Sequence, residues 1–404
     1  MAFGHTANHN GAALRPRSGP AGAPFARTAP RQRARLRLLR RSAAAVDVAT
    51  TEPGAASRCP PCPLGEALRA WVQANGGHMD PRLVVTERAP SGCRGVVATR
   101  AISAEDIAAD GPPIRVPEAI YMTADDASEV LQRRIDEHWG PAAAAAPGPL
   151  AWLRLGSRGA RGPPPPVSEV DGLSRLALLL AHERGKGEAS RWWPYVANLA
   201  GPAPCAWLME PPALRAALRD LLAARCGGDA GGAARAAALA AAWEAQIAAA
   251  GRVARARAAA LAGAYGDALG VDAAGLAWAM GQVVSRAFGR GDDVALAPLV
   301  DSCNHRGGAG VPFPLYARDP GQPRAGNGGG GGANGGSSGG GEGAPQPGRA
   351  ETLACVSPQA GGKAVGLEAG EELCISYSAI AGGGEGALGV FLTFGFLPDD
   401  CPLD

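Results

Sequence analysis

Three short segments near the C-terminal end of the sequence carry polar and aromatic groups that could take part in catalysis. Asn304 and His305 form an adjacent amide and imidazole pair, Tyr377 ends an apolar run, and Phe396 closes the segment FLTFGF. An amide and an imidazole can hydrogen-bond a polar ligand, and a phenol hydroxyl can orient a reacting group without ionising. Aromatic faces attract cations. The residue types therefore indicate a site that binds and orients a polar or cationic ligand.

Two further segments upstream carry groups of the same kind. The turn SGCRG at residues 91–95 contains Arg94 between glycines, which permit a close approach of the backbone to a ligand. Ser285 and Arg286 lie on a predicted helix and point away from its apolar stripe, which leaves both free to face something else. A guanidinium can bind a carboxylate through two parallel hydrogen bonds. Arg94, Ser285 and Arg286 are therefore further candidates for ligand binding.

The elements that must position these groups alternate between strand and helix along the chain. Short strands are predicted at residues 83–86, 96–99, 114–116, 352–356 and 372–377. Helices are predicted at residues 127–139 and 173–184, after Pro211, and after an N-cap at Asp272. In the last strand, period-two alternation places Leu373, Ile375 and Tyr377 on one face, so that Tyr377 ends a buried row. Strands on both sides of a helical block predict an α+β fold: a β-rich core with a large helical insertion.

Two segments have compositions that do not favour a packed core. Residues 1–46 contain nine arginines and no Asp or Glu, which is typical of an organellar transit peptide; a disordered basic arm for nucleic acid is the alternative. Residues 47–63 are interpreted as a linker. Residues 320–347 are dominated by Gly with Asn and Ser and are predicted to be a disordered surface loop.

The overall composition argues against several function classes. The 404-residue chain has a net charge of +2, which gives no global field that would favour nucleic acid or an anionic membrane. No apolar run reaches the roughly 18 to 20 residues needed to span a bilayer. Nine scattered cysteines favour a reducing compartment. Cys59 and Cys62 form a CPPC pair, but no second pair follows at metal-ligand spacing, so we expect no metal site.

Several motifs in a fixed order resemble the SET-domain protein methyltransferases, and most nearly the plant Rubisco large-subunit lysine methyltransferase branch. The motifs are GCRGVVATRAIS, LLLAHERGKGEASRWWPYVANL, VVSRAF, DSCNH, GEELCISY and TFGF. The resemblance runs from about residue 64 to the end of the sequence. It implies a SET core made of residues 64–121 and 285–404, interrupted by a helical insertion at residues 122–284.

The resemblance also implies an activity and a set of site residues. The activity is S-adenosylmethionine-dependent N-methylation of a lysine on a protein substrate, which requires alignment of donor and acceptor but no metal. The implied cofactor-binding residues are Arg94 through its backbone, Ser285, Arg286, Asn304, His305 and Phe396. Tyr377 is the implied catalytic residue, and Asp301 is interpreted as a structural carboxylate. With the predicted transit peptide, the implied location is the plastid stroma, where Rubisco large subunit and fructose-bisphosphate aldolase are candidate substrates.

Two departures from the family pattern leave alternatives open. Phe394 stands where members commonly carry Tyr, and the sequence ends at Asp404, whereas the Rubisco branch continues into a helical substrate-binding domain. Only Cys401 follows Tyr377, so the zinc-binding cysteine cluster of many histone methyltransferases is not expected. The alternatives are a noncatalytic SET-like module that binds a protein partner, a methyltransferase with a non-lysine acceptor, and a cytoplasmic location.

Overall fold

The computed structural model of the chain describes residues 61–91, 93–140, 164–199, 201, 203, 205–227, 230–306, 353–356, 358–360, 363–376, 386–397, 401 and 403. The chain divides into two compact units, Met1–Ala56 and Ser57–Asp404, and all the described residues belong to the second. The predicted transit peptide, the predicted Gly-rich loop and Tyr377 lie outside the described residues.

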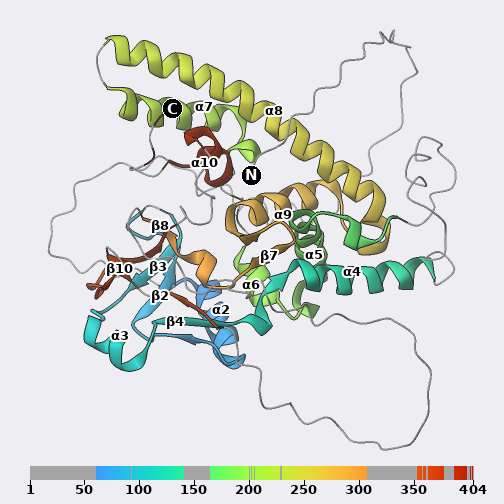
Figure 1. Ribbon diagram of the computed structural model, residues 1–404, viewed down its shortest axis with the longest axis horizontal. Coiled ribbons are helices and arrows are strands. Elements are labelled where there is room, and N and C mark those ends of the chain that lie inside the picture. Colours follow the sequence, from blue (N-terminus) through green and yellow to red (C-terminus); the bar gives the residue numbers. More distant parts are fainter. Residues whose placement is uncertain are drawn as a thin grey trace, which may run out of the picture. The chain divides into compact units, whose positions relative to one another are not determined.

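The strands form small sheets that combine segments from both ends of the folded unit (Figure 1). One sheet has the order β2 (Leu83–Thr86), β3 (Gly95–Ala98), β12 (Glu372–Ile375), β8 (Asn304–His305), and only β12 and β8 run parallel. The other sheets have the orders β1 (His78–Met79), β4 (Ile114–Pro117), β9 (Leu353–Val356); β5 (Met122–Thr123), β7 (Asp293–Leu296), β6 (Phe288–Arg290); and β10 (Gln359–Ala360), β11 (Lys363–Ala364). Strands before and after the helical block therefore pair directly with each other, as β3 with β12 and β4 with β9.

The helices of the described residues begin largely where the sequence predicts them. They are α2 (Pro63–Ala74), α3 (Ala104–Asp110), α4 (Ala124–Trp139), α5 (Gly172–Lys186), α6 (Trp193–Asn198), α7 (Pro211–Cys226), α8 (Ala230–Leu269), α9 (Ala273–Arg286) and α10 (Ala387–Phe394), with 3₁₀ turns η1 (Glu118–Ile120), η3 (Val167–Glu169), η4 (Gly187–Ala189), η5 (Ala206–Leu208) and η6 (Val300–Ser302). Asp272 caps α9 as predicted, because its side chain accepts a hydrogen bond from the Gly275 N–H at 2.7 Å.

Helix α5 is the centre of the main core. Its residues 176–180 are all fully buried, and it packs against α4, α6 and α9. A helix that is apolar on every side is stable in water only when neighbours cover all of its faces. The segment 176–180 therefore anchors the helical block; α9 packs directly against α5 (Figure 1), and its C-terminal end leads into β6.

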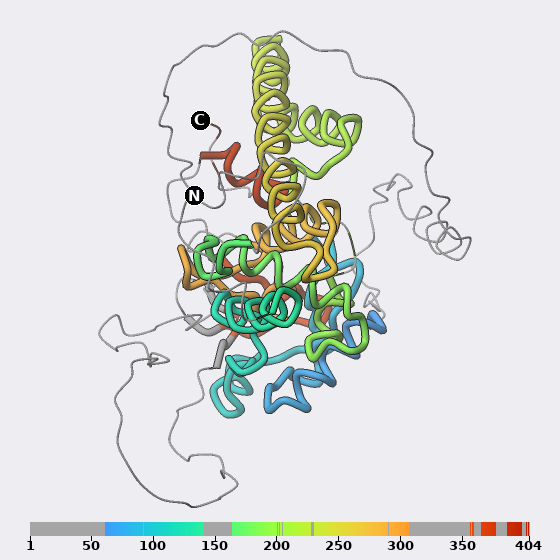
Figure 2. Tube along the Cα trace, turned by 90° about the vertical axis from the view of Figure 1, so that its right-hand side faces the viewer, coloured from blue at the N-terminus to red at the C-terminus, as the bar shows by residue number. Residues whose placement is uncertain are grey.

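Helices α7 and α8 form a second layer, which we call the α7–α8 arm. With 40 residues, α8 is about 60 Å long, and Figure 2 shows α7 beside its N-terminal part. The arm has its own apolar core, to which α10 contributes; its buried residues include Leu214, Leu218, Leu222, Trp243, Ile247 and Phe391. The later part of α8 packs against α4 and α9. The arm therefore connects the main core to the C-terminal helix.

The predicted α+β class is confirmed by this combination of helices and small sheets. One strand differs from its sequence pattern. All four residues of β12 are buried, whereas period-two alternation predicted burial on one face only. β12 lies between β3 and β8 in its sheet, and the burial of all four of its residues shows that both of its faces are covered. Within the described residues, no helix is both long enough and apolar enough to cross a membrane.

The hairpin of β6 and β7 supplies a first prediction. Gly289 has φ +96°, and a Cβ there would lie 1.8 Å from the Asp293 carbonyl oxygen on the paired strand. Gly289→Ala is therefore expected to lower the free energy of unfolding by about 3 kcal/mol, because the backbone must move. Gly291→Ala is the matched control, since it has φ +61° but nothing within 4 Å, and should cost only about 1 kcal/mol. Urea unfolding measures both; equal losses would contradict the steric explanation.

Candidate functional site

The candidate site is built where β8 pairs with β12. In this parallel pair, Asn304 lies beside Cys374 and His305 lies beside Ile375. The Asn304–His305 segment and the strand that precedes Tyr377, separated along the chain by the predicted Gly-rich loop, therefore meet through the fold. Tyr377 itself lies outside the described residues, but it follows Ile375 by two positions.

A buried carboxylate joins this strand pair to the Arg94 turn. The side-chain amide of Asn304 donates to Glu372 Oε1 at 2.6 Å and to the Arg94 carbonyl at 2.8 Å. The Ser91 N–H and hydroxyl donate to the same carboxylate at 3.0 and 3.1 Å. A Cβ at Gly95 would lie 2.4 Å from Glu372 Oε1, so a glycine is needed for this approach. We call Ser91, Arg94, Gly95, Asn304 and Glu372 the Glu372 cluster.

The Arg94 side chain extends away from the cluster to helix α6. Its two terminal nitrogens donate to the backbone carbonyl and the side-chain oxygen of Asn198, and Nη2 lies 3.9 Å from Cys62 Sγ. Its Nε is buried and has no hydrogen-bond partner among the described residues. The sequence prediction gave Arg94 a cofactor contact through its backbone; in the structure its carbonyl oxygen accepts from Asn304. The Arg94 turn is therefore held by Asn304 through the Arg94 backbone and by Asn198 through the Arg94 side chain.

A strained turn leads the chain into the site. The Val300 N–H donates to the Pro298 carbonyl at 2.8 Å, which closes a γ-turn around Leu299 with φ 66° and ψ −44°. Leu299 is the only residue other than glycine with positive φ in the described part of the chain. Such a conformation costs about 1–3 kcal/mol. The full burial of the Leu299 side chain offsets this cost. The turn delivers η6, and with it Asp301, to the site.

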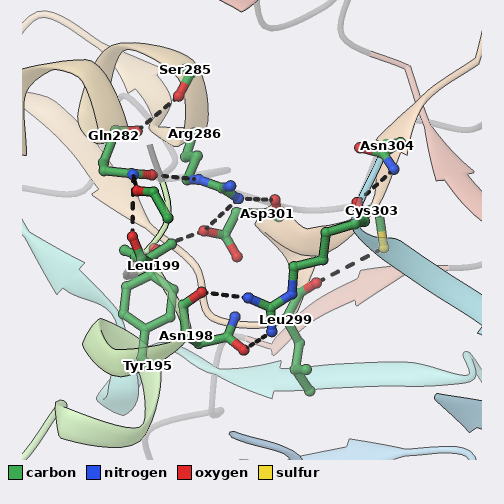
Figure 3. A network of polar contacts seen from close by, with 12 residues as sticks. Tyr195, Asn198, Leu199, Gln282, Ser285, Arg286, Leu299, Asp301, Cys303 and Asn304 are labelled. Atoms are coloured by element: carbon green, nitrogen blue, oxygen red, sulfur yellow. Dashed lines mark hydrogen bonds and ion pairs between the residues drawn. The ribbon is translucent and has the colours of Figure 1, made fainter. Parts of the chain in front are cut away.

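The end of α9 faces η6 (Figure 3). Arg286 Nε donates to Gln282 Oε1 at 3.0 Å, and its Nη1 donates to the Asp301 carbonyl at 2.8 Å and lies 3.7 Å from Oδ2 of the Asp301 carboxylate. Ser285 is buried, and its hydroxyl donates to the Gly281 carbonyl of its own helix at 2.9 Å. The sequence predicts that Ser285 and Arg286 face something other than the apolar stripe; in the structure, η6 and the segment after α6 cover that side of the helix.

Asp301 is the buried acid at the centre of this network. Its Oδ2 accepts a hydrogen bond from the Tyr195 hydroxyl at 2.7 Å, and its Oδ1 has no hydrogen-bond partner among the described residues. Burial raises the pKa of Asp301, while the Arg286 charge, the Tyr195 hydrogen bond and the Arg94 charge lower it. Burial also raises the pKa of Tyr195 well above its ordinary value, so the phenol remains a donor. Tyr195 therefore holds one oxygen of the Asp301 carboxylate, and the other oxygen has no hydrogen-bond partner among the described residues.

The Tyr195 hydrogen bond gives a second prediction. Tyr195→Phe should lower the free energy of unfolding by about 1.5–3 kcal/mol near pH 7.5, because a hydrogen bond to a charged acceptor is lost. The raised pKa of Asp301 means that stability falls as pH rises through that pKa; without the hydroxyl the pKa rises further and the fall is larger. The difference between wild type and variant should therefore grow as the pH rises above the ordinary pKa of an aspartic acid.

Urea unfolding at several pH values measures that difference. Tyr121→Phe is the matched control, because the Tyr121 hydroxyl donates at 3.3 Å to the neutral carbonyl of Val116. Tyr121→Phe should lower the free energy of unfolding by about 1 kcal/mol, and this decrease should not depend on pH. A pH-independent loss in Tyr195→Phe would show that Asp301 is not the charged partner.

An aromatic group completes the site on the side of α10. The ring centroids of His305 and Phe396 lie 6.4 Å apart, and those of Phe394 and Phe396 lie 6.1 Å apart. Gly395 has the left-handed φ of 74° and ends α10, so that Phe394 is buried while Phe396 is 38% exposed. Gly395 therefore turns the chain so that one phenylalanine packs inward and the other faces outward. The outward ring of Phe396 forms an aromatic face beside His305 that suits a cationic ligand.

Sequence reasoning identified the ligand-type residues but missed the groups that hold them. Glu372 and Asn198 were not singled out, and Tyr195 was noted only as part of a family motif. An acidic residue at the start of an otherwise apolar strand was the available signal for Glu372, since a buried carboxylate requires donors. In the described part of the chain, no group of three or more His, Cys, Asp or Glu residues could hold a metal ion.

Comparison with known proteins gives a weak structural likeness. No family model matches the chain, and no curated protein matches it. Among solved structures, it is similar to Rubisco LSMT bound to AdoMet (15% identity, TM-score 0.48) and to the SET domain of LSMT bound to MeLysine and AdoHcy (16% identity, TM-score 0.47). These matches cover 84% of this chain and 57–58% of the other chains. A TM-score below 0.5 at this identity does not establish a common fold.

Proposed function

We propose that this chain is a SET-domain protein methyltransferase that uses S-adenosylmethionine to methylate a lysine. The Glu372 cluster is the observation that carries the proposal. It joins the Arg94 turn and Asn304, which lie 210 residues apart in the sequence, at one buried carboxylate. These are two of the segments whose residues resemble the family's cofactor site, and their meeting supports the implied assignment.

The polar groups that remain beside the cluster suit the amino-acid end of the proposed cofactor. Arg94 Nε is a buried donor and Asp301 Oδ1 a buried acceptor, and neither has a hydrogen-bond partner among the described residues. The two residues are close enough for the Arg94 charge to lower the pKa of Asp301 against the larger effect of burial. A group with one carboxylate and one ammonium can satisfy both atoms. The faces of His305 and Phe396 suit a sulfonium.

S-adenosylmethionine supplies a methyl group carried on that sulfonium. The lysine nitrogen forms a bond to the methyl carbon as the carbon–sulfur bond breaks, and the extra proton on nitrogen passes to solvent. The chain's own task is to align the amine, keep it neutral and exclude water. Alignment alone can contribute about 7–11 kcal/mol. Burial beside aromatic rings disfavours the charged form of lysine, and the Tyr377 hydroxyl orients the amine.

The substrate and location are finer parts of the proposal. The arginine-rich residues 1–46 favour import into plastids, where Rubisco large subunit and fructose-bisphosphate aldolase are the candidate substrates. A fusion of residues 1–46 to a fluorescent reporter is expected to enter plastids. Retention of the reporter in the cytoplasm would contradict the location and, with it, the choice of stromal substrates.

The activity is tested with the full chain, labelled S-adenosylmethionine and a stromal extract. Isothermal titration calorimetry should show binding of the cofactor, and mass spectrometry should find the label on a lysine of one protein. Label on another residue type would support the non-lysine acceptor instead.

One observation favours a second candidate, a noncatalytic SET-like module that binds a protein partner. The Asn304 amide and the Arg286 guanidinium, both implied cofactor ligands, are already engaged by protein acceptors. If they remain so, the chain should bind S-adenosylmethionine without transfer, or should not bind it at all. Either result would overturn the enzyme proposal.

A further inference from the structure

The aromatic face at Phe396 is held by the helical insertion rather than by the strands alone. Phe396 follows α10, and α10 packs against η5 and α9. The ring of Phe391 on α10 lies 6.1 Å from the ring of Trp243 on α8, inside the core of the α7–α8 arm. The position of Phe396 relative to His305 therefore depends on how α10 is fixed to these helices.

A fully buried thiol connects α10 to α9. Cys205 Sγ lies 3.1 Å from the Gly281 carbonyl oxygen on α9 and 3.2 Å from the Thr393 carbonyl oxygen on α10. Thr393 belongs to the last turn of α10, where carbonyls have no partner within the helix. The single thiol hydrogen is therefore shared between an acceptor on α9 and an acceptor three residues before Phe396 that has no partner within its own helix.

The surroundings of Cys205 leave it little freedom to move. A Cβ at Gly281 would lie 2.3 Å from Leu208 Cδ1 and 2.8 Å from Ala203 Cβ, so the backbone around Cys205 is pressed against α9. Ser285, a predicted cofactor residue, donates to the same Gly281 carbonyl at 2.9 Å. Burial raises the pKa of Cys205 to about 12, so the thiol keeps its hydrogen at neutral pH.

We propose that Cys205 is a positioning residue that fixes the last turn of α10 to α9 and so holds Phe396 against His305. Cys205 contacts the same Gly281 carbonyl as Ser285 on α9, and it also contacts Thr393 on α10. It therefore connects the C-terminal part of α9 to the segment that carries the Phe396 ring. The consequence for methyl transfer rests on the proposed function; the consequence for α10 does not. Loss of the thiol hydrogen bond should loosen α10 and impair use of the protein substrate more than binding of the cofactor.

The test compares two variants of the full chain that differ in hydrogen-bonding ability. Cys205→Val is close in size and has no donor, whereas Cys205→Ser keeps a donor. Amide hydrogen exchange of α10, including the Gly395 N–H that donates to the Phe391 carbonyl, should be about three- to tenfold faster in Cys205→Val. Cys205→Ser should restore it to within about twofold of wild type, and exchange in α5 should not change in either variant.

Two exchange results would overturn the proposal. One is α10 exchange in Cys205→Val within about twofold of wild type. The other is equally faster exchange in α5 and α10 of both variants, because that reports general damage to the core.

The same variants link α10 to transfer. In Cys205→Val, kcat/KM for the protein substrate should fall about three- to tenfold while the cofactor Kd changes less than about twofold, and Cys205→Ser should recover the loss. Faster α10 exchange with unchanged kcat/KM would overturn the positioning role. If the wild-type chain neither binds cofactor nor transfers a methyl group, the proposed function fails, while the exchange experiment still decides whether Cys205 holds α10.

Discussion

Replacing Tyr377 by Phe is expected to lower kcat for methyl transfer by about 100- to 1,000-fold, which is the usual cost of removing one preorganised donor at a reacting centre. The ring remains, so the affinity for S-adenosylmethionine should stay within about threefold of wild type. The loss arises because the hydroxyl no longer orients the lysine amine or stabilises the charge that redistributes during transfer. Steady-state transfer of labelled methyl groups at saturating substrate measures kcat, and calorimetry measures the affinity.

The location of Tyr377 relative to the described strands supports this prediction. Ile375 pairs with His305 across the β12–β8 pair, and its carbonyl accepts the Arg306 N–H at 3.1 Å. Tyr377 follows Ile375 by two positions in the sequence, so the prediction places its hydroxyl at the site from the order of the residues that follow β12.

Tyr265→Phe is the matched control. Tyr265 is a buried tyrosine of α8 whose hydroxyl donates to the Pro165 carbonyl at 3.0 Å, inside the helical insertion. Removal of the Tyr265 hydroxyl should lower the free energy of unfolding by about 1 kcal/mol and leave kcat unchanged. Full turnover in Tyr377→Phe with normal cofactor binding would remove Tyr377 from the catalytic role.

The sequence predicted the local elements well because their signals are local. Residues 83–86 form β2 as predicted, since a short run of Val and Thr between polar segments favours a strand. Asp272 caps α9, because an acidic residue just before an apolar helical stripe can accept from the first free N–H groups. The α+β class follows from the order of such elements, which needs no knowledge of how they pack.

The supporting residues of the site could not be predicted because their roles depend on pairing between distant segments. Glu372 has a function only once β12 lies between β3 and β8, which brings Ser91 and Asn304 to it. The γ-turn at Leu299 has no local signal, because leucine has no preference for positive φ and burial alone offsets its strain. The Arg94 side chain likewise needs helix α6 in place before Asn198 can accept from it.

The inward position of Ser285 shows a different limit of periodicity. The apolar stripe of α9 correctly gives the face toward α5, but it does not show what covers the opposite face. That face receives η5, η6 and the segment after α6, so Ser285 is buried and Arg286 bonds to the Asp301 carbonyl. A helix in the interior has two covered faces, and only the more apolar one is visible in sequence.

Glu372→Ala is expected to produce the second large effect, on both stability and cofactor binding. The substitution removes the acceptor for the Ser91 N–H, the Ser91 hydroxyl and the Asn304 amide. Buried donors left without an acceptor should lower the free energy of unfolding by about 3 kcal/mol. The Arg94 turn then keeps only its direct hydrogen bonds to Asn304 and loses the shared carboxylate, and the affinity for S-adenosylmethionine should fall at least about tenfold, which corresponds to 1.4 kcal/mol.

The neighbouring Glu371 makes the experiment specific. Glu371 is half-exposed and pairs with Arg306 at 3.0 Å, so Glu371→Ala should cost at most about 1 kcal/mol and leave cofactor affinity within about twofold. Glu372→Gln should be intermediate, because its amide oxygen can still accept from Ser91 while its amide nitrogen faces the Asn304 donor. Urea unfolding and calorimetry separate the three variants. If Glu372→Ala behaves like Glu371→Ala in both measurements, the carboxylate does not hold the two segments together, and the site must be organised by backbone pairing alone.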